Sequence, residues 1–172
     1  EKKYPFPCKG KVTEGKGWVL RNSKGQYTLT LDGLKAGSLE RKTPALEIQG
    51  DLTLVLKKGT ESELLSADAA LKKGAGTLTI RGEGSLRLQG ETALEGEWKE
   101  ETLNQDEPSA LRIEGGKLVF TGEETALYED TVELAGGEIQ IQCLNGKGTG
   151  IRAHTLDDRH FSGSLEMEES EE

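Results

Sequence analysis

The sequence predicts an all-β fold, a right-handed single-stranded parallel β-helix of about five or six short coils with an N-terminal cap. Short stretches with alternating apolar and polar residues recur along the chain, and turns containing glycine join them in pairs. A weaker apolar element lies between successive pairs. An antiparallel meander or sandwich would also suit short strands and glycine turns, but it does not need the same order of elements in every repeat. The right hand follows the general preference of parallel crossover connections.

The paired strands form the clearest part of the repeat. Apolar residues at positions i and i+2 are typical of a strand with one buried face, so we expect Leu78, Ile80, Leu86 and Leu88 to point inward in one such pair. The same layout occurs in segments 45–56 (ALEIQGDLTLVL), 77–88 (TLTIRGEGSLRL), 110–120 (ALRIEGGKLVF) and 131–141 (TVELAGGEIQI), with partial copies at 27–34 and 161–167.

The third element is shorter, and it completes each coil. Its copies are Ala69-Ala70-Leu71, Thr92-Ala93-Leu94, Thr125-Ala126-Leu127 and Thr149-Gly150-Ile151. No window shows sustained helical periodicity, although we allow for a helical turn within 61–73. We expect one domain over residues 1–172, with a cap at 1–26, coils at 27–167 and an acidic tail at 168–172.

Composition and charge exclude some classes of partner. The chain has 31 acidic and 22 basic residues, a formal net charge of −9, and 33% hydrophobic residues. A net negative charge disfavours nucleic acid, because binding to phosphates depends on Lys and Arg. It permits Ca²⁺, cationic surfaces and neutral sugars, or it serves only to keep the protein in solution. No apolar run approaches the roughly 18 residues that span a bilayer, so we expect no membrane insertion in this segment.

The two cysteines, Cys8 and Cys143, leave the redox compartment open. With repeats stacked in order at about 4.8 Å per coil, the two residues lie several coils apart. A disulfide allows a Cα separation of up to about 7 Å, so a bridge would need the N-terminal segment to fold back. Free thiols are favoured, and pairing stays an alternative. The sequence starts at Glu1 rather than at a methionine, as expected for a mature or trimmed chain.

One segment has the composition of a catalytic centre. Asp157-Asp158-Arg159-His160, near His154, combines two carboxylates, a guanidinium and an imidazole, the groups that polysaccharide lyases and hydrolases use. A polar turn before the last strand explains the same residues. Zinc-ligand spacings, serine nucleophile motifs and phosphate loops are absent from the sequence. We therefore predict no catalytic residue and no certain cofactor, with Ca²⁺ as an option.

A binding surface is a better prediction than an active site. In a solenoid, outward residues at one position of successive coils form ladders that suit extended polymers. Aligning the third elements places Lys72, Glu95, Tyr128 and Arg152 in one ladder, with Trp98 nearby as a second aromatic platform. An aromatic ring can lie against a sugar, while charged groups bond its hydroxyls. The alternative is a solvated ladder in which Tyr128 merely covers the edge of the coil.

The paired strands predict two further ladders without aromatic residues. Arg112 above Glu133 should form a cross-strand ion pair. The first-strand ladder contains Glu47, Thr79, Arg112 and Glu133, and the second-strand ladder contains Thr53, Arg87, Val119 and Gln140.

The repeats carry a family resemblance over roughly residues 27–153. Segments 27–34, 45–56, 76–90 (GTLTIRGEGSLRLQG) and 111–122 resemble repeats of secreted bacterial β-helix proteins described as carbohydrate-binding domain proteins. The resemblance implies a right-handed parallel β-helix related in shape to pectate lyases. It also implies binding of acidic plant polysaccharide or cellulose with Ca²⁺ and without cleavage. No individual ligand residue of that family can be matched here.

Three functions follow, in decreasing order of preference. The first is a non-catalytic, extracellular carbohydrate-binding or adhesion module of a bacterial surface or secreted protein, with a polysaccharide or surface glycan as partner. The second is a structural spacer or protein-interaction solenoid within a larger adhesin. The third is a polysaccharide lyase or glycosidase.

Overall fold

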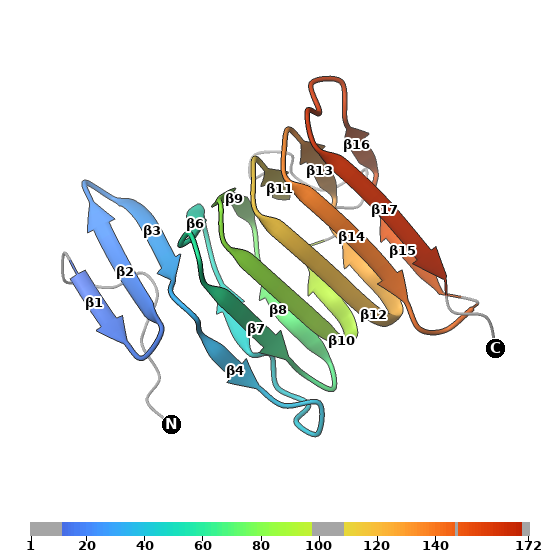
Figure 1. The fold of residues 1–172 in the computed structure, drawn as a ribbon, viewed down its shortest axis with the longest axis horizontal. Coiled ribbons are helices and arrows are strands. Elements are labelled where there is room, and N and C mark those ends of the chain that lie inside the picture. Colours follow the sequence, from blue (N-terminus) through green and yellow to red (C-terminus); the bar gives the residue numbers. More distant parts are fainter. Residues whose placement is uncertain (1–11, 98–108, 147, 170–172) are drawn as a thin grey trace.

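The computed structural model describes residues 12–97, 109–146 and 148–169, and every regular element in them is a β-strand (Figure 1). The strands wind into a solenoid of about five turns. Strands of successive coils pair in parallel, which an antiparallel meander does not allow. The predicted all-β solenoid is confirmed. The described residues include no helix long and apolar enough to cross a membrane.

One sheet of eight strands forms the side of the solenoid that we call side A. The pairs of β1 with β2 and of β2 with β3 are antiparallel, whereas every later pair in this sheet is parallel. In spatial order its strands are β1 (Val12–Gly15), β2 (Trp18–Ser23), β3 (Gln26–Leu31), β6 (Leu52–Leu56), β9 (Gly76–Gly82), β11 (Ser109–Ile113), β13 (Thr131–Leu134) and β16 (Thr155–Asp157).

The second sheet has nine strands and supplies two more sides. The chain bends within the long strands β10 (Ser85–Glu95) and β12 (Lys117–Tyr128), where the register shifts between Gly90 and Thr92. Side B contains the first parts of β10 and β12 with β4 (Lys35–Gly37), β7 (Glu61–Leu65), β14 (Glu138–Cys143) and β17 (Ser164–Glu169). Side C contains their last parts with β5 (Leu46–Ile48), β8 (Ala69–Lys73) and β15 (Thr149–Arg152).

The prediction for the strand pair at 45–56 is wrong, because it aligns these strands with the pair at 77–88, and the structure places them on other sides of the solenoid. Its first strand is β5 on side C and its second is β6 on side A, so Glu47 stacks on Lys72 and Thr53 stacks on Thr79. The strand–glycine–strand pattern occurs at the corner around Gly50 as well as at the corner around Gly82, and periodicity alone cannot distinguish the two corners. The helical turn allowed within 61–73 is also wrong, because these residues form β7 and β8.

The core consists of apolar rows that run across the coils. On side A, Leu78, Leu111 and Val132 occupy one row and are fully buried. On side B, Leu88 and Phe120 are equivalent and equally buried. Full burial of such side chains stabilises the fold by about 1.5–3 kcal/mol each. A narrow interior filled by these rows can therefore stabilise the fold although the chain has few apolar residues.

The two ends of the solenoid differ. At the N-terminal end the β1–β2 hairpin pairs with β3, and Leu20 is buried while Trp18 packs against the core. Residues 1–11 of the expected cap lie outside the described residues. At the C-terminal end β17 pairs with β14 through Glu169, so a strand extends into the segment expected as an acidic tail.

Candidate functional site

The outward ladder predicted on the third elements exists on side C. Strand register pairs Lys72 with Glu95, Glu95 with Tyr128, and Tyr128 with Arg152. Glu47 extends the same row by one coil through its pairing with Lys72. Neighbouring positions lie about 4.8 Å apart along the solenoid. We call these five residues the side-C ladder.

Charge alternates along the side-C ladder. It carries acidic Glu47, basic Lys72 and acidic Glu95, followed by the aromatic Tyr128 and basic Arg152. Lys72 and Arg152 are exposed, while Glu95 and Tyr128 are half-buried. The row therefore presents hydrogen-bond donors and acceptors side by side.

Tyr128 and Arg152 form the most distinctive contact of the ladder. The guanidinium carbon of Arg152 lies 5.7 Å from the centroid of the Tyr128 ring, within the range of a cation–π interaction. This contact places the guanidinium of Arg152 over the face of the Tyr128 ring. Trp98, the second predicted aromatic platform, lies outside the described residues.

A row of threonines accompanies the ladder on side C, and sequence reasoning did not assign it to a site. Register aligns Thr92, Thr125 and Thr149, and all three are at least partly exposed. Threonine hydroxyls both donate and accept hydrogen bonds. The signal in the sequence was the repeated threonine that opens the third elements.

Side B carries a shallow depression rather than an aromatic platform. Arg87, Val119 and Gln140 form one row as expected, but the first member is Glu63 of β7 and not Thr53. The depression has a volume of about 210 Å³, and its lining residues are Lys117, Leu118, Val119, Glu138, Ile139, Gln140, Ser164 and Glu166. Its lining is mixed in charge, and no ring lies in it.

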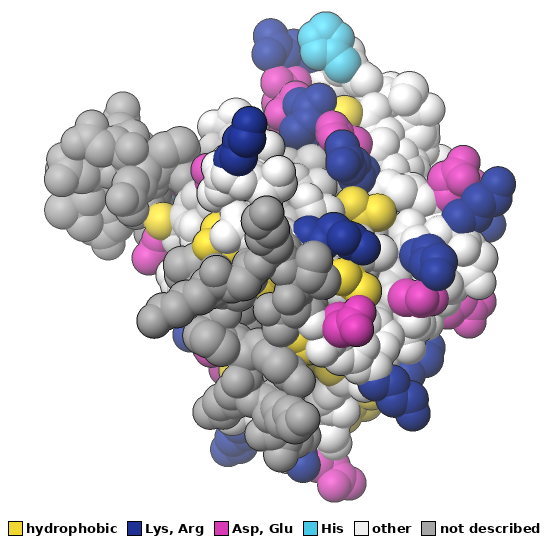
Figure 2. Space-filling model, turned by 90° about the vertical axis from the view of Figure 1, so that its left-hand side faces the viewer, with side chains coloured by type: hydrophobic (Ala, Val, Ile, Leu, Met, Phe, Trp, Pro, Cys, Tyr) yellow, Lys and Arg dark blue, Asp and Glu magenta, His cyan; other side chains and the backbone are white. Residues whose placement is uncertain are grey.

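Charge is mixed on one face of the described surface (Figure 2) and along side A. Figure 2 shows basic and acidic side chains interspersed over the face that it presents. On side A, Arg112 forms the expected ion pair with Glu133 and also contacts Glu114, and these contacts raise the pKa of Arg112. Because acidic and basic side chains pair with one another, this part of the surface lacks a strong positive potential that would attract a polyanion.

The stretch at 157–160 forms a polar turn. Asp157 accepts hydrogen bonds from the backbone N–H of Arg159 at 3.1 Å and from its guanidinium at 3.0 and 2.9 Å. These bonds lower the pKa of Asp157 to about 2. Asp158 and His160 are exposed, and His154 contacts Asp130. Within the described ranges, no group of three or more His, Cys, Asp or Glu side chains has a geometry suited to a metal ion.

A buried polar network, which sequence reasoning missed, closes the corner between sides C and A. The Lys73 Nζ lies 2.9 Å from a Glu129 carboxylate oxygen, and both side chains are fully buried. Lys73 also donates to the hydroxyl of Ser109 at 2.9 Å and to the carbonyl of Gly74 at 3.0 Å. Ser109 in turn donates to Glu129 at 2.7 Å, as does the N–H of Asp130 at 2.8 Å.

Gly96 explains how this network fits inside the solenoid. Lys73 and Glu129 each follow a ladder residue and lie two coils apart, with Gly96 in the coil between them. A Cβ at Gly96 would overlap the Glu129 carboxylate. The missing side chain thus leaves the space in which the lysine and the glutamate meet. Because the groups are buried, no substrate can reach them in this arrangement, and we assign the network a structural role in which each charge depends on its partner.

The fold and its exposed ladders define the class of protein, a β-solenoid that presents extended polar surfaces. A family model for carbohydrate-binding domain-containing proteins matches residues 3–170, and the chain belongs to this family. This membership indicates a carbohydrate-binding role. No curated protein and no solved structure matches the chain.

Cys143 carries a free thiol that is buried and faces the carbonyl oxygen of Asn145 at 3.3 Å. Cys8, the other cysteine, lies outside the described residues.

Proposed function

We propose that this chain is a non-catalytic carbohydrate-binding module whose ligand lies on the side-C ladder. The observation that carries the proposal is the continuous row of Lys72, Glu95, Tyr128 and Arg152, with an aromatic ring among groups that bond hydroxyls. Family membership supports a carbohydrate as the ligand. The parallel stacking of coils supports an extended polymer, because equivalent groups repeat at a constant spacing along one line.

In this proposal the polysaccharide runs along the solenoid axis, across the strands of side C. One sugar ring lies against Tyr128, and its hydroxyls bond Arg152 and Glu95. The adjacent sugars reach Lys72 and the hydroxyls of the threonine row. Alternating charge favours a neutral or weakly charged glycan over a strong polyanion, because an anion would meet the carboxylates of Glu47 and Glu95. Binding of this kind needs no metal.

The proposal includes a place of action, on a bacterial cell surface or in a secreted complex, where the module would serve adhesion to a glycan. The resemblance of the repeats to those of secreted bacterial proteins supports this location. Fractionation of cells that express the full-length protein would test it.

The binding experiment uses a panel of neutral glucans, polygalacturonate and mucin glycans, with and without Ca²⁺. Tyr128→Ala should weaken the affinity for the ligand about tenfold, since an aromatic contact contributes roughly 1 kcal/mol or more. Tyr128→Phe should bind like the original chain, because it keeps the ring. Val119→Ala on side B is the matched control, and thermal unfolding checks that each variant is folded.

The outcomes separate the three functions. Binding that Tyr128→Ala weakens and Val119→Ala does not would support the side-C ladder. Equal binding by all variants would move the site to another surface. If the chain bound none of the glycans in the panel, the result would favour a structural spacer or protein-interaction solenoid within a larger adhesin. If the original chain shortened a glycan and Asp157→Ala abolished this cleavage, the protein would be a lyase or glycosidase.

A further inference from the structure

Within the part of the chain that the structure describes, the solenoid ends at its C-terminal side in a sheet edge with no strand paired beyond it. Among the described residues, β17 pairs only with β14, and β16 pairs only with β13. Figure 1 shows both strands at the end opposite the N-terminal hairpin. An open edge presents backbone N–H and C=O groups that can pair with another strand.

The apolar rows of the core emerge at this edge. Leu156 continues the fully buried row of Leu111 and Val132, yet it is 47% exposed. Met167 continues the row of Phe120 and Ile141 and is 56% exposed. Leu165 is 36% exposed. The inward face of the last coil is thus left uncovered by the described residues.

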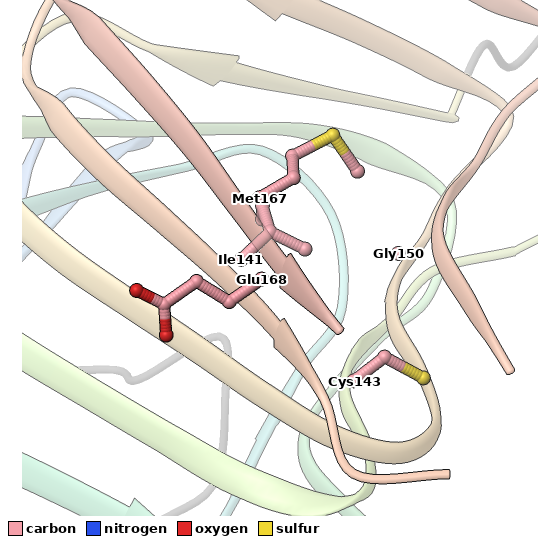
Figure 3. Close-up of a pocket in the computed structure, with 5 residues that line it drawn as sticks. All are labelled: Ile141, Cys143, Gly150, Met167 and Glu168. Carbon is pink, nitrogen blue, oxygen red and sulfur yellow. The ribbon is translucent and has the colours of Figure 1, made fainter. Parts of the chain in front are cut away.

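A cavity opens beside this face. It has a volume of about 350 Å³ and is lined by Ile141, Cys143, Gly150, Met167 and Glu168. Figure 3 shows Met167 and Cys143 projecting into the space between β17 and the segment that carries Gly150. The terminal methyl group of Met167 lies directly over Gly150, where the absence of a side chain leaves room for it. The cavity can accept an apolar side chain from an added strand.

The outward face of β17 is acidic. Glu166 and Glu168 are exposed, and Glu168 accepts a hydrogen bond from the side-chain amide of Gln142 at 3.2 Å. A strand added beside β17 would place its own outward side chains about 4.8 Å from these carboxylates. Basic residues at alternate positions would be favoured there, and acidic residues would be disfavoured.

We propose that the β17 edge binds an extended segment of another protein in which apolar and basic residues alternate. The segment adds one strand to side B. Its apolar residues cover Leu165 and Met167 and fill the cavity, while its basic residues pair with Glu166 and Glu168. A second copy that met this edge with its own β17 is a poorer occupant, because it would bring the same carboxylates against these two.

The probe is a capped, fluorescent ten-residue peptide of alternating lysine and valine, titrated into the full chain and followed by polarisation. It should bind at least tenfold more tightly than a glutamate–valine peptide. The double variant Glu166→Lys/Glu168→Lys should reverse that preference. Glu61→Lys/Glu63→Lys, on β7 of the same side, is the matched control and should keep it.

A second probe separates strand addition from simple charge attraction. The lysine–valine peptide with alternate backbone amides N-methylated keeps its charge but cannot form the ladder, so it should lose binding. Hydrogen exchange should show protection of the β17 amides by the unmodified peptide. Undiminished binding of the methylated peptide, or equal effects of the two double variants, would overturn the proposal. Self-association of the chain through β17 at neutral pH, seen by sedimentation, would assign the edge to a second copy instead.

Discussion

The central coils and the last coil of this solenoid carry the same alternation of residues but differ in what covers them. Leu111 and Leu156 belong to one inward row two coils apart, and the first is fully buried while the second is half exposed. The alternation of apolar and polar residues decides which side chains can face inward. The presence of a neighbouring coil on both sides decides whether those side chains are buried. Stability should therefore be concentrated in the central coils, and the addition of a foreign strand at the open end.

The largest effect should come from breaking the buried ion pair in the central coils. Lys73→Met leaves the Glu129 carboxylate buried without its cation, and such a loss costs about 3–5 kcal/mol. The double variant Lys73→Met/Glu129→Leu should recover most of the lost free energy of unfolding, because no buried charge is then left without a partner. Chemical denaturation of the three proteins measures it. A double variant as unstable as the single one would show that packing, and not charge, sets the loss.

Truncation of equivalent leucines compares the two regions directly. Leu111→Ala should lower the free energy of unfolding by about 2–5 kcal/mol, because it leaves a cavity in a closed core. Leu156→Ala should cost under about 1 kcal/mol, because its side chain is already half in water. The same denaturation experiment applies. Equal losses at the two positions would mean that the last coil is covered in solution, for instance by self-association.

A smaller effect is expected for the surface ion pair on side A. Arg112→Ala removes the partner of Glu133, and exposed pairs contribute about 0–1 kcal/mol. Salt should reduce even this difference. Thermal unfolding at low and high ionic strength measures the change, with Glu133→Ala and the double variant completing the cycle. A salt-independent loss would point to the packing of the arginine stem instead of its charge.

The smallest effect concerns the turn at the open end and depends on pH. Hydrogen bonds from Arg159 lower the pKa of Asp157 from its ordinary 3.8 to about 2. A carboxyl whose pKa is lowered by folding stabilises the fold above its unfolded pKa and loses this contribution as pH falls. The loss should occur between about pH 4 and 2. NMR titration of Asp157 checks it, and in Arg159→Gln the pKa should return toward 3.8.

Much of the side-C ladder could be predicted because it depends on local order alone. The third elements share an apolar position, so aligning them placed Lys72, Glu95, Tyr128 and Arg152 in register without knowledge of the coil's shape. The pairing of Arg112 with Glu133 followed in the same way. The strand pair at 45–56 could not be assigned to the correct sides of the solenoid, because a glycine turn occurs at two different corners of the coil.

The sequence by itself determined that the chain is a β-solenoid and which side chains form most of its rows, because the same order of two alternating strands and a third element recurs in each repeat, which stacked coils need and a sandwich does not. The tertiary structure alone decided where each coil turns, which rows end in water, and that Lys73, Ser109 and Glu129 meet inside. These features depend on contacts between residues that lie tens of positions apart in the chain. The gap at Gly96 that admits the ion pair exists only once three coils are stacked.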